Sequence, residues 1–252
     1  MLSQLFSSNL DLIVQLFLVG LSLITSFITA SMGIGGGTIM LAVMAQVLPI
    51  AAVVPIHGVI QLGSNFGRSA LLAKFIDYRS LLWFSVGCLL GAIAGGQIVW
   101  TLSSTFLQVL LGSFILFSTW GIKPKLSRVS SSGLAFGGLI TTVLTLFVGA
   151  TGPFVLAMLK TLKNQDRMQL VANTAAFMSI QHILKILVFG MLGFQFADYF
   201  GLICMMLVSG LIGTYLGKQA LIKVQEDRFQ KILNIVLTVL ALRLIFSNLP
   251  IW

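Results

Sequence analysis

The sequence predicts an all-α polytopic membrane protein built from two inverted repeats, each a glycine-apex helical hairpin followed by three spanning helices. Three observations support this prediction: the composition, the lengths of the apolar runs and an internal match between the two halves. The chain has 252 residues, of which 58% are hydrophobic and only 8% charged, and its mean hydropathy is +1.05. Because soluble domains carry about 25% charged residues, a soluble fold of this size would leave too much apolar surface in water.

The apolar runs have the length and pattern of membrane helices. They show little of the period-2 alternation that an outer-membrane strand requires, and most approach the ~20 residues that span a bilayer as a helix. Two are short, at 37–48 and 153–161, and each follows a glycine-containing break. The runs lie at 11–31, 37–48, 53–76, 80–101, 105–121, 133–150, 153–161, 169–194, 199–218 and 229–247.

The first break contains four glycines, Gly33, Gly35, Gly36 and Gly37, between two apolar runs. Each glycine costs a helix about 1 kcal/mol relative to alanine, so this segment interrupts the helix. We interpret it as the apex of a hairpin that enters the membrane and returns to the same side, because irregular backbone at membrane depth occurs where it lines a cavity. The alternative is that the glycines only allow two helices to pack closely.

Matching segments at nearly constant offset indicate that the chain is a duplicated unit. The stretch "FIDYRSL" at 75–81 matches "FADYFGL" at 196–202, and "GIGGGTIM" at 33–40 matches "GATGPFVL" at 149–156. Short segments interrupted by glycine or proline in matching places of two halves are typical of a transporter's binding site. The expected organisation is a first repeat at 1–122, a cytoplasmic linker at 123–132 and a second repeat at 133–252.

The basic residues indicate that the two copies are inverted. The loop at 75–81 and its surroundings are basic, whereas the matching loop at 196–202 carries only Asp198 and the next loop, 218–231, is strongly basic. Since basic loops face the cytoplasm, the same loop is expected inside in one copy and outside in the other, with both termini outside. The four basic clusters are Lys74/Arg79, Lys123/Lys125/Arg128, Lys160/Lys163/Arg167 and Lys218/Lys223/Arg228/Lys231.

A polar stripe follows one face of the predicted helix in the first half. It consists of His57, Gln61, Ser64, Asn65 and Arg68, which share one helical face by their spacing. Polar side chains within a membrane helix must face protein or water. Two alternatives remain open: Gln61 and Ser64 as hydrogen-bonding links between helices, and Arg68, together with Lys185 of the second half, as side chains that reach the cytoplasmic edge.

The second half carries a thinner stripe of Asn173, Gln181 and Lys185, with His182 beside it. The six acidic residues all lie in loops or at the ends of runs, so the predicted interior holds basic groups and no carboxylate. Helices that restart after the two breaks also direct the positive ends of their dipoles inward. Such a site favours an anion. The residues expected to bind it are Gly33, Gly35, Gly36, Gly37, His57, Gln61, Ser64, Asn65, Arg68, Thr151, Gly152, Asn173, Gln181 and Lys185.

Other classes of site have less support in the sequence. No G-x-S-x-G motif or interior group of metal ligands is found, so we expect no enzyme, no metal and no cofactor. Cys88 and Cys204 lie within apolar runs and are read as small buried residues. A channel remains the alternative to a carrier, an intramembrane enzyme is a weaker one, and His57 is the one interior proton carrier that we nominate, with a structural histidine as the alternative.

The glycine break, the stripe "HGVIQLGSNFGR" at 57–68, "FIDYRSL" at 75–81 and the weaker second copy together resemble the sulfite exporter TauE/SafE family over nearly the whole chain. The resemblance implies a multi-pass permease that exports or imports sulfite, organosulfonates or similar small anions. The chain departs from the family pattern in two respects. No proline stands shortly after the glycine break, and the second copy keeps only Gly149, Gly152 and Pro153 of the glycine pattern.

These predictions define the expected partners and location. The net charge of +9 is assigned to basic loops that face anionic lipid, and no nucleic-acid partner is expected. The partners are a small anion and membrane lipid, and a homodimer is left open. The expected location is the plasma membrane, which is the inner membrane of a bacterium.

Overall fold

The protein is all-α, as the sequence predicts. The structure, a computed structural model, describes residues 10–33, 35–99, 103–121, 129–162, 165–220 and 226–246, and no β-strand occurs within these ranges. The first half contains α1 (Leu12–Met32), α2 (Gly36–Val47), α3 (Ile50–Leu71), the 3-10 helix η2 (Ala73–Phe75), α4 (Tyr78–Val99) and α5 (Ser104–Trp120). The second half contains α6 (Ser131–Val148), α7 (Gly152–Leu159), α8 (Arg167–Met191), the 3-10 helix η3 (Phe196–Tyr199), α9 (Phe200–Ala220) and α10 (Glu226–Phe246).

Among the described residues, six helices are long and apolar enough to cross a membrane: α1, α3, α4, α6, α8 and α9. The helix α5 has 17 residues and is shorter than the ~20 that a span needs, and α10 begins with charged residues. Hence only two of the three helices predicted to span after each hairpin meet this criterion. The protein is nevertheless a multi-pass membrane protein.

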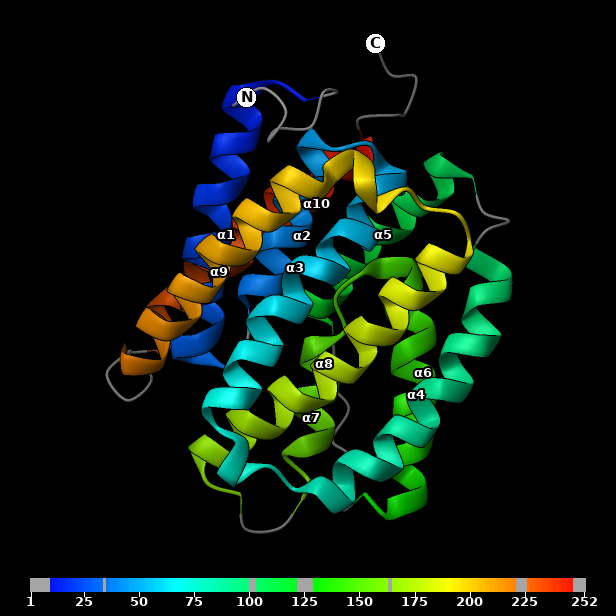
Figure 1. Ribbon diagram of the computed structural model, residues 1–252, viewed down its shortest axis with the longest axis vertical. Helices are drawn as coiled ribbons and strands as arrows, with labels where there is room; N and C mark the ends of the chain where they lie inside the picture. Colours follow the sequence, from blue (N-terminus) through cyan, green and yellow to red (C-terminus); the bar gives the residue numbers. More distant parts are fainter. Residues whose placement is uncertain are drawn as a thin grey trace.

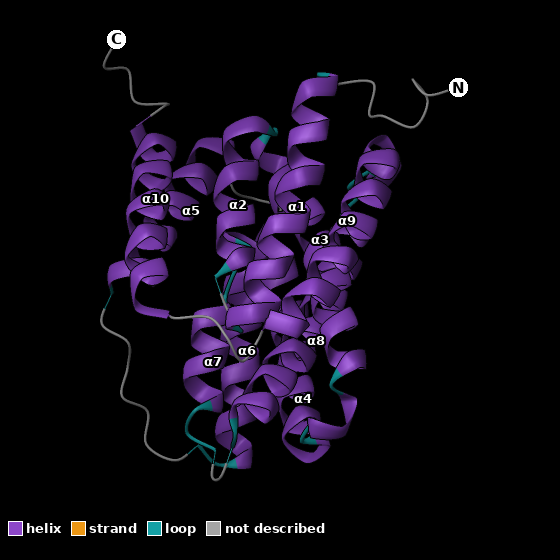
Figure 2. Ribbon diagram, turned by 90° about the vertical axis from the view of Figure 1, so that its left-hand side faces the viewer, coloured by secondary structure: helices purple, strands orange, loops and turns teal. Residues whose placement is uncertain are grey.

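Both predicted helical breaks are present and each joins a long helix to a short one. The helix α1 has 21 residues and α2 has 12, while α6 has 18 and α7 only 8. Figure 2 shows the α1–α2 pair in the upper half of the molecule and the α6–α7 pair in the lower half, with the two breaks meeting near the middle. The short helices α2 and α7 therefore begin in the interior.

The helices α3 and α8 pack against each other between the two hairpins (Figure 1). On one flank α1 packs against α9, on the other α6 packs against α4, and α5 packs against α10. If α1–α5 are exchanged for α6–α10 in order, the α1–α9 and α4–α6 pairs exchange with each other, and the α3–α8 and α5–α10 pairs each map onto themselves. The helix pairing therefore supports a duplicated unit.

The glycines of α4 and α9 show the same exchange at the level of single residues. A Cβ atom on Gly91 would overlap the backbone of Leu139 in α6, and one on Gly213 would overlap the backbone of Leu23 in α1. Gly213 follows the stretch "FADYFGL" at nearly the same distance as Gly91 follows "FIDYRSL", and both let two helix backbones approach closely, as small residues do in membranes. The inverted relation of the two copies remains a prediction.

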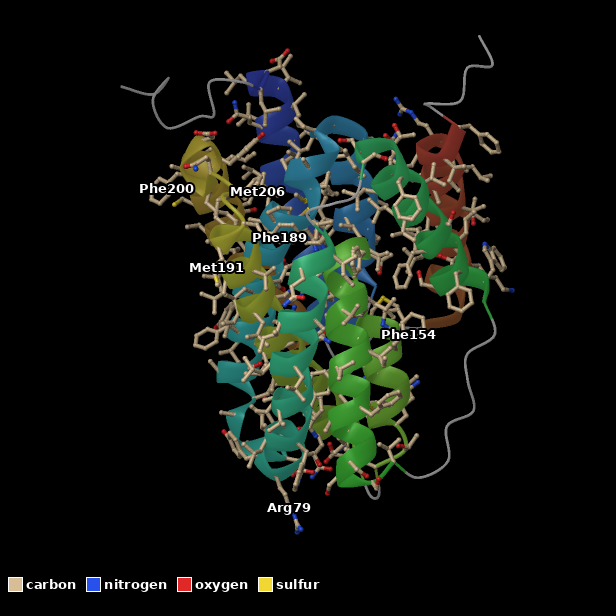
Figure 3. The ribbon with its side chains drawn as sticks, turned by 90° about the vertical axis from the view of Figure 1, so that its right-hand side faces the viewer. Arg79, Phe154, Phe189, Met191, Phe200 and Met206 are labelled. Carbon is tan, nitrogen blue, oxygen red and sulfur yellow. The ribbon has the colours of Figure 1, made fainter. Side chains whose placement is uncertain are left out.

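The positions of the helix ends show at which end of the molecule the described terminal helices and the matched loops lie. The beginning of α1 and the end of α10 lie at the same end of the molecule (Figure 1). Phe200, which begins α9, lies towards that end, whereas Arg79 in the first turn of α4 lies at the opposite end (Figure 3).

Two predicted boundaries differ from the structure. The loop predicted at 75–81 is shorter, because η2 ends at Phe75 and α4 begins at Tyr78. The helix α6 begins at Ser131, within the predicted linker, where the Ser130 hydroxyl accepts a hydrogen bond from the Gly133 N–H and caps the helix. Residues 122–128, which carry one of the basic clusters, lie outside the described residues.

Candidate functional site

The first break depends on glycines with left-handed backbone. The helix α1 ends at Gly33, whose φ is +86°, and Gly35 has a φ of +109° before α2 begins at Gly36. Only glycine adopts such values without a steric cost, so these two residues turn the chain back on itself.

The next two glycines provide space. A Cβ on Gly36 would overlap the Thr25 carbonyl oxygen and the Thr29 hydroxyl of α1, so Gly36 holds α2 against α1. A Cβ on Gly37 would lie 3.0 Å from Oε1 of Gln61, so Gly37 admits the side chains of α3. Both interpretations of the glycine break therefore apply, each to different residues. Gly33 and Gly35 turn the chain, and Gly36 allows α1 and α2 to pack closely.

The second break has a different chemistry. The helix α6 ends at Gly149 with a φ of +76°, and α7 starts at Gly152 with Pro153 in its first turn. A Cβ on Gly152 would meet no atom within 4 Å, so this glycine faces open space. Thr151 is fully buried, and its hydroxyl donates to Oε1 of Gln181 at 3.1 Å rather than capping α7.

The predicted stripe on α3 is buried, but its members have different partners. His57 contacts the first apex, with its Nε2 at 2.9 Å from the Gly37 carbonyl oxygen. Ser64 pairs with the Thr214 hydroxyl of α9 at 3.1 Å, so it links two helices. Asn65 donates from Nδ2 to the Gln61 carbonyl oxygen at 2.8 Å.

Arg68 completes this stripe and reaches the end of α1. It is 2% exposed, and one terminal nitrogen donates to the Thr29 carbonyl oxygen at 2.7 Å while the other donates to Oδ1 of Asn65. Its Nε has no hydrogen-bond partner among the described atoms. Arg68 is thus buried among protein groups. The alternative interpretation, in which its side chain extends to the aqueous edge, does not describe this arrangement.

The stripe on α8 divides in a similar way. Asn173 accepts from the backbone N–H of Asp77 at 2.7 Å and so supports the start of α4. Gln181 donates from Nε2 to the hydroxyls of Thr141 and Thr142 in α6. Lys185 is completely buried and donates from Nζ to the Gly149 carbonyl oxygen at 2.7 Å.

The two interior cations occupy corresponding positions at the ends of the long hairpin helices. Arg68 binds a carbonyl of the last turn of α1, and Lys185 binds the carbonyl of the residue that ends α6. The carboxyl end of a helix carries partial negative charge, so a cation there is stabilising. The amino ends of α2 and α7, by contrast, have no side-chain cap, and the first N–H groups of a helix lack partners within it.

A cavity of about 40 Å³ lies where the two breaks meet α3 and α8. This volume accommodates a few water-sized groups. Of the residues predicted to bind substrate, those that line it are Gly33, Gly35, Gly37, His57, Gln61, Asn65, Arg68 and Gly152. The predicted residues outside its lining are Gly36, Ser64, Thr151, Asn173, Gln181 and Lys185.

Several lining residues were not among the predicted site residues. They are Thr29, Thr38, Ala150, Pro153, Thr174, Met178 and His182. His182 is one residue beyond the predicted stripe, and a histidine in a membrane helix is a signal that should have placed it in the site. Its ring lies 6.0 Å from the ring of His57, in an edge-to-face arrangement.

The cavity presents hydrogen-bond donors and no acid. Its lining contains an arginine, two histidines and the beginnings of α2 and α7, and no Asp or Glu is among its described residues. Of the four acidic residues with described side chains, Asp11, Asp77 and Asp166 directly precede helices, and Asp198 lies in η3, two residues before α9. The arrangement is therefore suited to a small anion and unsuited to a cation.

Comparison with models of protein families gives a match over most of the chain. The family model described as "Sulfite exporter TauE/SafE" matches residues 17–244. No curated protein and no solved structure matches the chain.

Proposed function

Since the chain belongs to the sulfite exporter TauE/SafE family, we propose that it is a permease that moves a small sulfur oxyanion, such as sulfite or an organosulfonate, across the plasma membrane. Membership identifies a membrane transporter of sulfur anions, and a transporter family is consistent with the absence of an enzymatic role. The particular anion, the direction and the bacterial inner membrane as location are parts of the proposal.

The proposed binding site is the cavity at the meeting point of the two breaks. The observation that carries this assignment is that the uncapped amino ends of α2 and α7 both border one cavity, through Gly37 and Gly152. Free N–H groups and the positive end of the dipole at a helix start bind oxyanions. The two short helices together supply donors from both halves of the chain.

The side chains complete an environment for one negative charge. Arg68 borders the cavity with its Nε unpaired, and Asn65 lies beside it. A charge-assisted hydrogen bond from arginine to an oxyanion is about twice as strong as a neutral one. Because Lys185 is bound to Gly149, it contributes its positive charge to the region rather than a direct contact.

The orientation follows from the basic residues. Arg79 lies at the end opposite the beginning of α1 (Figure 3), and the end of α7 and the beginning of α8, which carry further basic residues, lie towards the same end (Figure 1). By the positive-inside rule, we propose that this end faces the cytoplasm and that both termini face outward. The proposed repeats remain 1–122 and 133–252.

Alternating access between two inverted repeats is the proposed mechanism, with the anion held near the membrane midplane. A channel is the second candidate, and the sequence offers no motif that distinguishes the two. The two differ in one measurable property, since only a carrier shows exchange of substrate driven by substrate on the other side.

The test is transport by the purified protein in liposomes. Vesicles are loaded with unlabelled sulfite, sulfate, thiosulfate, methanesulfonate, phosphate or chloride, and uptake of radiolabelled sulfite is measured with and without a pH gradient. We expect saturable counterflow driven by sulfite or a sulfonate and little by chloride. Uptake that no loaded sulfur anion stimulates would refute the proposal, and uptake that never saturates would favour a channel.

A further inference from the structure

Two histidines face each other across the cavity, one from each half of the chain. His57 comes from α3 and His182 from α8, each is 1% exposed, and their ring centroids are 6.0 Å apart. Both line the cavity assigned above to the anion.

Three of their four ring nitrogens have no partner among the described atoms. These are Nδ1 of His57 and both nitrogens of His182. Because the Gly37 carbonyl can only accept, the hydrogen bond at 2.9 Å assigns the proton of neutral His57 to Nε2. Its Nδ1 is then a buried basic nitrogen without a donor. Buried polar atoms in native proteins are normally paired, so these three nitrogens require a ligand, water or a proton.

Among the described residues, the surroundings of the pair hold positive groups and no acid. Lys185 lies one turn beyond His182 on α8, and Arg68 lies at the far end of the cavity on α3. The helices α1, α2, α5, α6 and α7 carry no titratable side chain. In the described parts of α4 and α9 the titratable groups are Tyr78, Arg79, Cys88, Cys204, Tyr215 and Lys218, none of which lines the cavity. The remaining neighbour, η2, carries Lys74, which is exposed.

We propose that the His57–His182 pair takes up one proton together with the anion, so that the permease carries a proton with its substrate. This inference rests on the proposed function, because the cavity must bind an anion. Imidazole is the side chain whose charge changes near neutral pH, and the described cavity lining holds two of them and no other such group.

The cost of an unpaired buried charge explains why the proton and the anion strengthen each other's binding. A proton that binds a ring nitrogen of the empty cavity adds a buried positive charge beside Lys185, and such a charge is costly without a partner. An anion that enters the cavity supplies the partner. By thermodynamic linkage the proton strengthens anion binding by the same factor as the anion strengthens proton binding. Two protons on rings this close would repel each other, so the expected number is one.

The proton comes from water and returns to water. It leaves the solvent on the side where the anion enters, binds Nδ1 of His57 or a nitrogen of His182, and is released with the anion on the other side. His182 has both nitrogens unpaired among the described atoms, so it has one N–H to donate when neutral and two once it is protonated. The net charge moved is then one unit less negative than that of the anion alone.

The experiment measures proton uptake on anion binding to the purified full-length protein. Titration calorimetry with methanesulfonate, whose charge is constant between pH 5 and 8, is performed in two buffers that differ in ionisation enthalpy. Sulfite is titrated in parallel, with its own protonation subtracted. We expect about one proton per bound anion near neutral pH, and an affinity that rises about tenfold for each unit fall in pH.

The variants locate the proton. The double variant His57→Gln/His182→Gln should bind anion without proton uptake and with little pH dependence, whereas Met191→Leu, at an exposed position of the same helix α8 outside the cavity lining, should keep both. Anion binding by the native protein without proton uptake would overturn this inference and leave the proposed function standing. Uptake that persists in the double variant would also overturn it. Failure of sulfite and methanesulfonate to bind at any pH would instead refute the proposed function.

Discussion

Substitution of Gly36 by alanine tests whether the first apex is held by close packing. The added Cβ would overlap the Thr25 carbonyl oxygen and lie 2.7 Å from the Thr25 carbonyl carbon. Non-bonded carbon atoms pack at about 3.5–4.0 Å, so α2 must move away from α1 by about 1 Å. The obstacle is backbone of α1, which cannot turn aside as a side chain could.

The displacement reaches the cavity through the next residue. Gly37 would move with Gly36, and the hydrogen bond from its carbonyl oxygen to His57, now 2.9 Å, would lengthen beyond useful range. Overpacking typically costs 1–3 kcal/mol and a lost hydrogen bond about 0.5–1.5 kcal/mol. We therefore expect Gly36→Ala to lose about 2–4 kcal/mol of stability, which corresponds to roughly 4–16 °C in melting temperature.

The assay is thermal unfolding of the purified protein in detergent, followed by intrinsic fluorescence, together with sulfite counterflow in liposomes. The matched control is Gly20→Ala on α1, the helix against which Gly36 packs, because a Cβ on Gly20 would meet no atom within 4 Å. The control should melt and transport as the native protein does. A Gly36→Ala protein with native melting temperature and native counterflow would refute the packing argument for this apex.

Two further predictions concern charge and orientation. Arg68→Gln should weaken anion affinity about tenfold or more, as loss of a charge-assisted hydrogen bond does. The control is Lys74→Gln, which changes an exposed lysine near the start of α4 and should alter the affinity little. Equal affinities of the two variants, measured by calorimetry, would remove Arg68 from the site. In a background without native cysteines, Tyr78→Cys should react with an impermeant maleimide only from the cytoplasmic side and Ala197→Cys only from outside. Labelling of both from one side would contradict the inverted repeat.

The helices and their breaks could be predicted from the sequence because both leave local signals. Apolar length identifies a membrane helix, and glycine or Gly-Pro within such a run identifies a break. The runs at 37–48 and 153–161 correspond closely to α2 and α7, and the break before each contains residues with positive φ. The duplicated pattern was visible for the same reason, since it repeats these signals at a constant offset.

Which residues of the two stripes line the cavity and which link helices could not be predicted in this way. Helical spacing shows which residues share a face, but not which neighbour that face meets. Ser64 therefore joined the predicted site although it contacts α9, and Asn173 did so although it supports α4. His182 was left out although it borders the cavity. These outcomes depend on the packing of α3 and α8, which involves residues more than a hundred positions apart.

The cations show a further limit of sequence reasoning. A lysine among apolar residues was expected to contact the anion, but Lys185 donates to the Gly149 carbonyl oxygen. That carbonyl has no partner in the backbone ladder of α6 because the helix ends there, and it also accepts from the Thr145 hydroxyl at 3.2 Å. Gly58 leaves the space through which the lysine stem passes, since a Cβ on Gly58 would lie 2.9 Å from its Cδ. Neither fact is readable from the residues around Lys185.

The most direct test of the account is to fill the cavity without disturbing its walls. Gly152 borders the cavity and has open space around it, and Gly20 has similar space on an exposed face of α1. Both are changed to leucine, and sulfite counterflow is measured in liposomes that contain equal amounts of folded protein. The account predicts that Gly152→Leu abolishes counterflow, while Gly20→Leu stays within about twofold of the native rate, as surface substitutions do. Native counterflow by a folded Gly152→Leu protein would show that the anion does not pass through this cavity.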